Sequence, residues 1–181
     1  MDKKISDMDF YWAENYIGVS PKAHEYAIKT PSPLGLNNDF FNKAVQGSNS
    51  MTYRNTYTSM GINFRSKNEL IVAELLKDLG LKFKYEPRIV LGNNVEIYPD
   101  FLIGIEEADR CFVFEMQGMM NDANYALKAS QKETIYINHG FRDGKDILFF
   151  KAGNDSIDFD VLRLFIEAVV EANIKEAFGL S

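Results

Sequence analysis

Between residues 66 and 80, apolar side chains recur every three or four positions, which is the period of a helix with one buried face. Ser66 and Glu69 form the pattern of a capping box, which satisfies free N–H groups at the start of a helix. Gly80 is the residue type that most often follows a helix. The pattern therefore predicts a helix whose apolar positions include Leu70, Ala73, Leu76 and Leu79.

After Gly80 the pattern changes to the alternation of apolar and polar residues that is typical of half-buried strands. Leu81, Phe83 and Tyr85 alternate with charged residues, whereas residues 111–117 are apolar until the last three, as in a strand buried on both faces. Strands are predicted at 81–85, 95–103 and 111–117, with turns at 92–94 and 106–109. The last two strands would form a hairpin.

Helical spacing returns further along the chain. Asn121 or Asp122 caps a predicted helix that runs to about residue 137, and residues 146–151 form a short apolar strand. The final helix is predicted from 159 to about 174, with Leu162, Phe165, Ile166, Val169 and Val170 facing inward. The order from residue 66 is αβββαβ followed by one more helix, which predicts an α/β fold with a mixed sheet and helices on both faces.

The chain divides into an N-terminal extension, 1–60, and a core, 61–181. Short helices are predicted at 21–28, behind a capping serine and a proline, and from residue 37 or 38 to about 45, followed by a linker at 46–50. The stretch 51–60 is either a strand or an ordered arm. Its Tyr53, Arg54 and Tyr57 are suited to stacking on nucleotides, although docking of the arm onto the core is the favoured interpretation.

Two carboxylates fall at corresponding places in the predicted hairpin. If its turn is centred on residues 107 and 108, Asp100 lies opposite Glu115, with Cβ atoms about 4.5–5.5 Å apart. Gln117 points to the same face. Because facing carboxylates repel unless a positive charge lies between them, Mg²⁺ or Mn²⁺ is the expected occupant. Glu69 could supply a third oxygen ligand.

The sequence Pro99-Asp100, followed by Glu115-Met116-Gln117 and preceded by a helix with Glu69, resembles the PD-(D/E)XK nuclease superfamily. The resemblance covers residues 66–151, and the run 118–128 is similar to small bacterial and phage-associated members. It implies a restriction-endonuclease-like core and metal-dependent hydrolysis of phosphodiester bonds, with DNA as the favoured substrate and a phage or mobile element as a source. Asp100 and Glu115 would then hold the metal, with Glu69 as auxiliary acid.

Gln117 stands where the resemblance would place a catalytic lysine. A glutamine can orient a water through hydrogen bonds, but it carries no charge and does not take up a proton. Some members have glutamine there, and others recruit a lysine from the following helix. Lys128 and Lys132 are four residues apart, so they share a helix face and are both candidates, with Lys128 slightly preferred.

Composition limits the alternatives. The net charge is −6, and the acidic excess lies in residues 61–181, which disfavours tight nonspecific binding to DNA by this chain alone. One cysteine and two distant histidines argue against a structural zinc site, and Cys111 is predicted to be a buried small hydrophobe. No apolar run is long enough to span a membrane, so a cytoplasmic location is expected.

Two readings of the function remain open. One is the metal-dependent endonuclease, acting alone, as a homodimer or with a protein partner. The other is a catalytically weak or inactive nuclease-fold module that binds nucleic acid or a protein; Gln117 and the acidic charge both favour it. A nucleotide-transfer enzyme is disfavoured because the chain has no glycine-rich phosphate loop.

Overall fold

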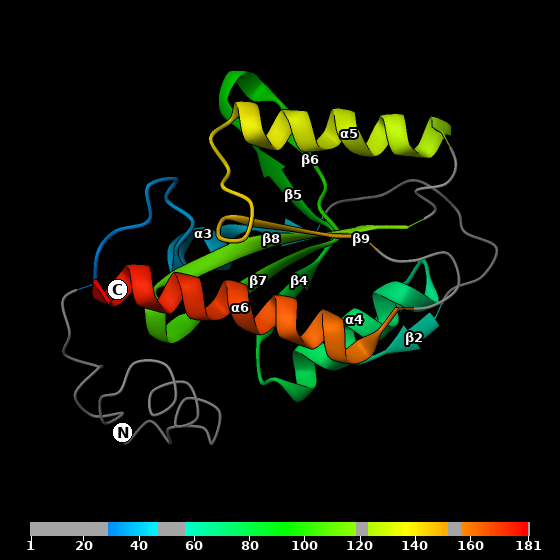
Figure 1. The fold of residues 1–181 in the computed structure, drawn as a ribbon, viewed down its shortest axis with the longest axis horizontal. Coiled ribbons are helices and arrows are strands. Elements are labelled where there is room, and N and C mark those ends of the chain that lie inside the picture. Colours follow the sequence, from blue (N-terminus) through cyan, green and yellow to red (C-terminus); the bar gives the residue numbers. More distant parts are fainter. Residues whose placement is uncertain (1–28, 47–56, 119–122, 152–156, 181) are drawn as a thin grey trace.

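A four-stranded mixed sheet forms the centre of the protein in the computed structural model, which describes residues 29–46, 57–118, 123–151 and 157–180 (Figure 1). The strands lie in the order β4 (Lys82–Tyr85), β7 (Phe101–Ile105), β8 (Arg110–Gln117) and β9 (Ile147–Lys151). The first three are antiparallel, and β9 runs parallel to β8. The parallel pair requires a crossover, which the helix between residues 123 and 138 provides.

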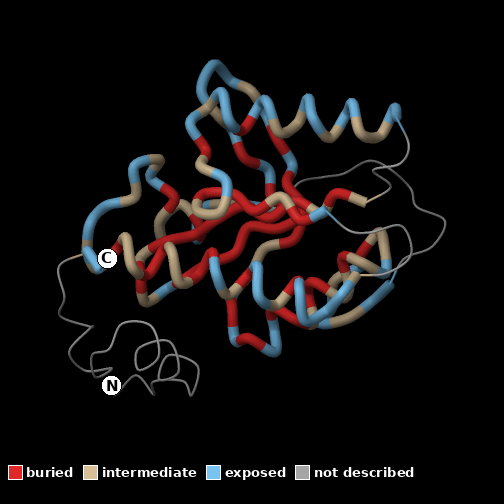
Figure 2. Tube along the Cα trace, in the orientation of Figure 1, coloured by how far each residue is buried: buried red, intermediate tan, exposed pale blue. Residues whose placement is uncertain are grey.

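Helices cover both faces of this sheet, which confirms the predicted α/β class. On one face α4 (Lys67–Asp78) and α6 (Phe159–Phe178) pack on the side chains of Phe101, Ile103 and Phe112. On the other face Phe41 of α3 (Asn38–Lys43) and Tyr136 of α5 (Ala123–Asn138) pack on alternate strand residues. Figure 2 shows the central strands as the most continuously buried part of the chain.

The capping box predicted at Ser66 is present at the start of α4. The Ser66 hydroxyl accepts a hydrogen bond from the backbone N–H of Glu69 at 3.1 Å, and the Glu69 carboxylate accepts one in return from the Ser66 N–H at 3.1 Å. Gly80 follows the helix with φ +68°, a conformation that costs glycine little. The predicted helix is thus confirmed at both ends.

The register of the β7–β8 hairpin agrees with the predicted one. Phe101 pairs with Phe114, and Ile105 pairs with Arg110. The turn between the strands is the short 3₁₀ helix η3 (Glu106–Ala108). Gly104 of β7 lies directly under the Phe41 ring, where an added Cβ would come within 3.3 Å of ring carbons. A side chain at Gly104 would therefore require the Phe41 ring to shift by a few tenths of an ångström.

The strand predicted at 95–103 is wrong as a single element. It is interrupted, because β6 (Glu96–Ile97) pairs with β5 (Pro87–Val90) in a separate small sheet that also contains β1 (Val45–Gln46). Pro99 has no N–H to donate to a ladder, so the chain leaves one sheet before it enters β7 in the other. The β5 strand and this second sheet were not predicted. The turn predicted at 92–94 is confirmed, and it is the short 3₁₀ helix η2 (Gly92–Asn94).

Other boundaries differ in smaller ways. The helix predicted near residues 37–45 is α3, capped by Asn37. In the stretch 51–60, which was predicted as either a strand or an arm, residues 57–59 form β2 (Tyr57–Ser59), which pairs with β3 (Ile62–Phe64). Three predicted features lie outside the described residues: the helix at 21–28, the rest of the linker and arm at 47–56, and the cap of α5. α6 extends to Phe178. Phe165, which was predicted to face inward, is half exposed: its ring packs edge-on against the buried Phe150 at a centroid distance of 5.8 Å, and 50% of the residue remains exposed.

Two predictions from composition can be compared with the structure. Cys111 is buried in β8, and burial raises the pKa of its thiol to about 12, which confirms its role as a small core residue. Among the described residues, the helices are all too short or too polar to cross a bilayer.

Candidate active site

Asp100 and Glu115 lie together where β7 begins and β8 approaches its end. The Asp100 Oδ2 atom accepts a hydrogen bond of 2.7 Å from the backbone N–H of Met116, which follows Glu115 in β8. Both carboxyl side chains are buried, at 8% and 3% exposure. The hairpin register thus brings together the two acids that the sequence predicted to face each other.

Helix α5 supplies two donors to Glu115. The Lys132 Nζ atom lies 2.7 Å from Glu115 Oε2, and the Tyr136 hydroxyl donates to Glu115 Oε1 at 2.5 Å. Lys132 and Tyr136 are four residues apart, so they project from the same face of the helix. Both oxygens of this buried carboxylate are therefore engaged by α5.

Arg65 lies among three acids, one of which is Asp100. Its Nη2 atom forms an ion pair with Glu86, and it lies 3.5 Å from Asp100 Oδ1 and 3.6 Å from Glu69 Oε1. Glu86 is buried, and its backbone has φ +44°, which is unusual for a residue with a side chain. This turn follows β4 directly and directs the Glu86 carboxylate to the guanidinium.

Glu69 has a structural role that uses one of its oxygens. Glu69 Oε2 accepts hydrogen bonds from the backbone N–H of Arg65 at 2.9 Å and from the Tyr85 hydroxyl at 2.8 Å, in addition to the capping bond from Ser66. Glu69 Oε1 faces the Arg65 guanidinium instead. The second oxygen is the one that a ligand could use without loss of the helix cap.

Burial raises the pKa of the Asp100 and Glu115 carboxyl groups. Burial, and then the neighbouring charge of Glu115, raise the pKa of Asp100 to about 7, although Lys132 and the Met116 N–H act in the opposite direction. Burial also raises the pKa of Glu115, against the attraction of Lys132. A carboxyl whose pKa is raised by a second carboxylate is stabilised in its charged form by any added cation.

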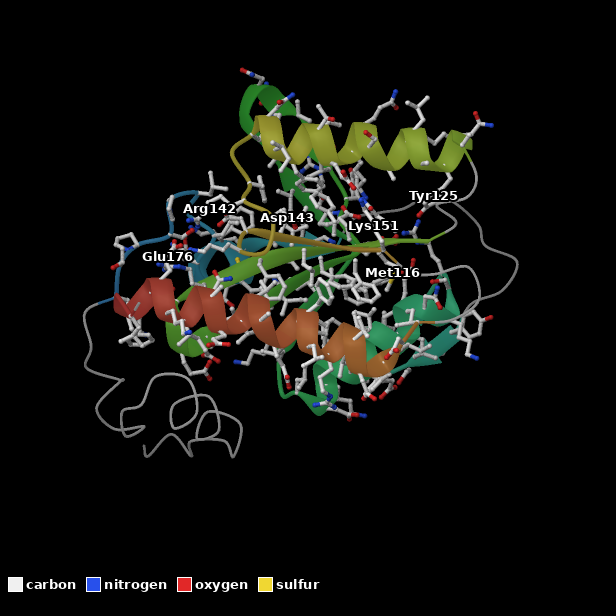
Figure 3. The ribbon with its side chains drawn as sticks, viewed as in Figure 1. Met116, Tyr125, Arg142, Asp143, Lys151 and Glu176 are labelled. Carbon is white, nitrogen blue, oxygen red and sulfur yellow. The ribbon has the colours of Figure 1, made fainter. Side chains whose placement is uncertain are left out.

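Gln117 is buried at the same end of β8. Its Nε2 atom donates to Glu133 Oε1 of α5 at 2.7 Å, and Glu133 also lies 3.7 Å from Lys151 Nζ. Its Oε1 atom is buried and accepts no hydrogen bond from the described residues. Figure 3 shows Tyr125 and Lys151 toward this end of the sheet, away from Arg142 and Glu176. The free amide oxygen is a potential acceptor for a ligand or a water molecule.

The two candidate lysines occupy different environments. Lys132 contacts Glu115 and also donates to the Tyr98 carbonyl oxygen at 3.3 Å. Lys128 is exposed on α5, one turn nearer its start. The sequence slightly favoured Lys128 over Lys132 as the catalytic lysine. The structure favours Lys132, because its ammonium contacts the Glu115 carboxylate.

The donor atoms at this site suit a hard cation. Asp100, Glu115 and Glu69 offer carboxylate oxygens, which Mg²⁺ and Mn²⁺ prefer, and the charge repulsion at Asp100 would be relieved by either ion. Within the part of the chain that the structure describes, no group of three or more Asp, Glu, His or Cys side chains is arranged so that it could hold a metal ion as it stands. Arg65 and Lys132 already contact the acids, so a metal would have to share the carboxylates with these cations.

Several residues of the site were not predicted from the sequence. Arg65, Tyr85 and Tyr136 contact the predicted acids, and Glu86 forms an ion pair with Arg65. The sequence could have indicated Tyr136, because it lies four residues after Lys132 on the same helix face, whereas Glu86 reaches the site only through its unusual backbone turn.

Comparison of the chain with known protein families, with curated proteins and with solved structures found no match.

Proposed function

We propose that the protein is a metal-dependent nuclease with a restriction-endonuclease-like core, and that it hydrolyses phosphodiester bonds, with DNA as the favoured substrate. The observation that carries the proposal is the pair of buried acids, Asp100 and Glu115, at the end of an antiparallel hairpin with Lys132 beside them. A buried acid pair with a raised pKa is the kind of group that concentrates at functional sites.

In this proposal Asp100 and Glu115 hold Mg²⁺ or Mn²⁺, and Glu69 assists through Oε1. A bound ion would supply positive charge at the scissile phosphate and make the attacking water more acidic. Arg65 offsets part of the charge of Glu69, Glu86 and Asp100 in the absence of metal. It also keeps these side chains close together, which limits the rearrangement that metal binding requires.

The roles of Gln117 and Lys132 are complementary. Because Gln117 Nε2 is committed to Glu133, its Oε1 atom is left to accept a hydrogen bond from a water and so to orient it. Gln117 carries no charge, whereas the Lys132 ammonium lies 2.7 Å from Glu115. Lys132 would stabilise the negative charge that develops on the phosphate, a contribution that preorganised donors commonly make.

Two observations favour the alternative, a nuclease-fold module with weak or no activity. Lys132 and Tyr136 already engage both oxygens of Glu115, so this carboxylate is satisfied without a metal. The net charge of −6 points in the same direction, because it disfavours tight contact with phosphates. Such a module would bind nucleic acid or a protein partner without cutting.

Cleavage of supercoiled plasmid, single-stranded DNA and RNA, with and without Mg²⁺ or Mn²⁺, tests the proposal. Asp100→Asn and Glu115→Gln keep the shape of each side chain and should abolish cutting. Lys132→Ala should reduce the rate about a hundredfold or more. Lys128→Ala is the matched control on the same helix and should retain activity.

A second readout separates the two functions. A functional metal site stabilises the folded protein by RT ln(1 + [L]/Kd), so both ions should raise the melting temperature of the wild type and leave that of Glu115→Gln unchanged. Folded wild-type protein that neither cuts any of the three substrates nor melts higher with metal would contradict the nuclease and support the binding module.

A further inference from the structure

Two consecutive residues of helix α5 bind two alternate residues of strand β8. The Lys132 ammonium lies 2.7 Å from Glu115 Oε2, and the next residue, Glu133, accepts a hydrogen bond of 2.7 Å from Gln117 Nε2. Because Glu115 and Gln117 are two residues apart in the strand, their side chains lie on the same face of the sheet. The Gln117–Glu133 contact therefore lies beside the contact that α5 makes with the buried acid.

The side-chain amide of Gln117 has two different edges, and only one of them suits Glu133. The Nε2 edge donates hydrogen bonds, whereas Oε1 accepts them. An ionised carboxylate only accepts hydrogen bonds, so Glu133 attracts the Nε2 edge and repels the carbonyl edge. The observed contact, from Gln117 Nε2 to Glu133 Oε1, is the one that this chemistry requires. Glu133 thus determines which way the Gln117 amide is turned.

The amide edge that is turned away from Glu133 has no donor. Gln117 is 4% exposed, and its buried Oε1 atom accepts no hydrogen bond from the residues that the structure describes. Such an atom costs free energy, and native proteins keep few of them. Turning the amide over would not remove the cost, because Oε1 would then face the Glu133 carboxylate. An acceptor that is held in this way points to a ligand that supplies the missing positive partner.

The chemistry of this carbonyl oxygen limits what can bind beside it. A water molecule can donate a hydrogen bond to it, and a hard cation can be coordinated by it. A phosphate oxygen is repelled, because it carries negative charge. The reversed amide would present N–H groups, which are common donors to phosphates in complexes with nucleic acids. The orientation of one amide therefore selects between a water or cation and a phosphate.

We propose that Glu133 is a positioning residue, which holds the Gln117 amide with its carbonyl oxygen toward a bound water or cation and so excludes phosphate from that position. The catalytic part of this role rests on the proposed nuclease, in which Gln117 orients the attacking water. Glu133 adds the group that fixes this orientation. A competing explanation is the ion pair with Lys151, whose Nζ atom lies 3.7 Å from Glu133 Oε1 and whose side chain is 60% exposed.

NMR of the Gln117 amide tests the orientation without any need for activity. The chain has three glutamines, Gln46, Gln117 and Gln131, so selective labelling gives three NH2 groups, and Gln117→Met identifies the relevant one. In the wild type and in Lys151→Met, one proton of this group should be shifted downfield and protected from exchange, because it is bound to a carboxylate. Glu133→Gln can accept or donate, so the shift and the protection should be lost. A wild type without this signal overturns the proposal, and so does its loss in Lys151→Met.

Titration with inorganic phosphate, followed at the same amide signal, tests the exclusion of anions. Glu133→Gln should bind phosphate about threefold or more tightly than the wild type, because the reversed amide donates to it. The double variant Glu133→Gln/Gln117→Met removes the same charge but has no amide, so the gain should disappear. A gain that persists in the double variant would come from charge alone and would overturn the proposal, as would equal phosphate binding by Glu133→Gln and the wild type.

The kinetics of plasmid cleavage with Mg²⁺ test what the orientation does in the proposed nuclease. Glu133→Gln should lower kcat about tenfold or more and change KM less than about threefold, because the attacking water is no longer oriented while substrate binding is retained. Lys151→Met should keep the wild-type kcat. An unchanged kcat in Glu133→Gln, or an equal loss in Lys151→Met, overturns the proposal.

The three measurements separate this role from the nuclease activity itself. Wild type that shows the fixed amide and excludes phosphate, but cuts no substrate, would contradict the nuclease and support the orientation of Gln117 by Glu133. Wild type that cuts DNA without the fixed amide signal would contradict the role of Glu133 alone.

Discussion

The Lys132 ammonium lies 2.7 Å from Oε2 of Glu115, so a partly exposed cation on α5 meets a carboxylate that is buried in the central sheet. This contact joins two elements, β8 and α5, that are separated in the sequence by residues 118–122.

Replacement of Lys132 by alanine should destabilise the metal-free protein by about 1–3 kcal/mol, because Glu115 remains buried and loses its charged donor. Lys128→Ala should change the free energy of unfolding by less than about 0.5 kcal/mol, since Lys128 is exposed. Urea denaturation in the presence of EDTA measures both. Equal effects of the two substitutions would show that the Lys132–Glu115 contact does not stabilise the fold.

Tyr136→Phe removes only the hydroxyl that donates to Glu115. The ring keeps its edge contacts with Phe141 and Phe149, at centroid distances of 5.3 and 5.8 Å. Burial and the charge of Glu115 raise the pKa of Tyr136 well above its usual range, so the hydroxyl stays protonated and donates. We expect a loss of about 1–3 kcal/mol in the free energy of unfolding.

A double-mutant cycle gives the control for this substitution. In Glu115→Gln the carboxylate charge is absent, so adding Tyr136→Phe should cost less than it costs in the wild type. Strictly additive effects in chemical denaturation would show that the hydroxyl and the carboxylate are not coupled.

Asp100 should make the metal-free protein less stable as the pH rises. Its pKa is raised from 3.8 to about 7 in the folded state, so the folded protein binds a proton more tightly than the unfolded chain does. The resulting stabilisation is fully present below about pH 4 and is lost as the pH rises through about 7. The free energy of unfolding should fall by roughly 4 kcal/mol at most over this range. Thermal unfolding in EDTA between pH 4 and 8 measures this dependence.

Asp100→Asn removes the titrating group and keeps an oxygen that can accept the Met116 N–H. The variant should therefore melt at a higher temperature than the wild type at pH 8 in EDTA, and the difference should decrease toward pH 4. A variant that is less stable than the wild type at pH 8 would show that the charged form of Asp100 is favourable in the fold.

Glu176→Gln should loosen the C-terminal half of α6. Hydrogen bonds from Arg142 and Lys145 lower the pKa of Glu176 to about 2, so its contribution is complete above the ordinary pKa near 4.5 and is lost as the pH falls through about 2. We expect the variant to be about 1–2 kcal/mol less stable at pH 7 and the difference to shrink at pH 3. Urea midpoints at the two pH values measure it.

Glu96→Gln is the comparison for Glu176→Gln, because Glu96 forms an ion pair with Arg88 in which both side chains are more than 40% exposed. Solvent screens such a pair, so this change should alter stability by less than about 0.5 kcal/mol. If Glu176→Gln has no larger effect than Glu96→Gln, the Arg142–Glu176 contact does not anchor α6.

Local sequence patterns were sufficient where a structural feature depends on neighbours in the chain. The capping box of Ser66 and Glu69 and the alternation of β4 were predicted because such hydrogen bonds and faces are decided within a few residues. The opposition of Asp100 and Glu115 was also predictable, since one short turn fixes the register of a hairpin.

Tertiary structure decided what depends on distant segments. The break at Pro99 was missed because the strand before it pairs with β5 in another sheet, which no local pattern reveals. Arg65 and Glu86 reach the acids only because β3, β4 and β7 converge, and the choice of Lys132 over Lys128 depends on how α5 lies across the sheet.

The half-exposed position of Phe165, at the edge of the buried face of α6, has the same origin. Helical spacing alone allows two apolar faces on α6, and only packing on the sheet determines which of them is buried. The sequence by itself thus determined the order of the elements and the acid pair of the β7–β8 hairpin, since these follow from local hydrogen bonding and side-chain period. The cations and hydroxyls that surround the acids were decided by the tertiary structure, because long-range packing brings them there.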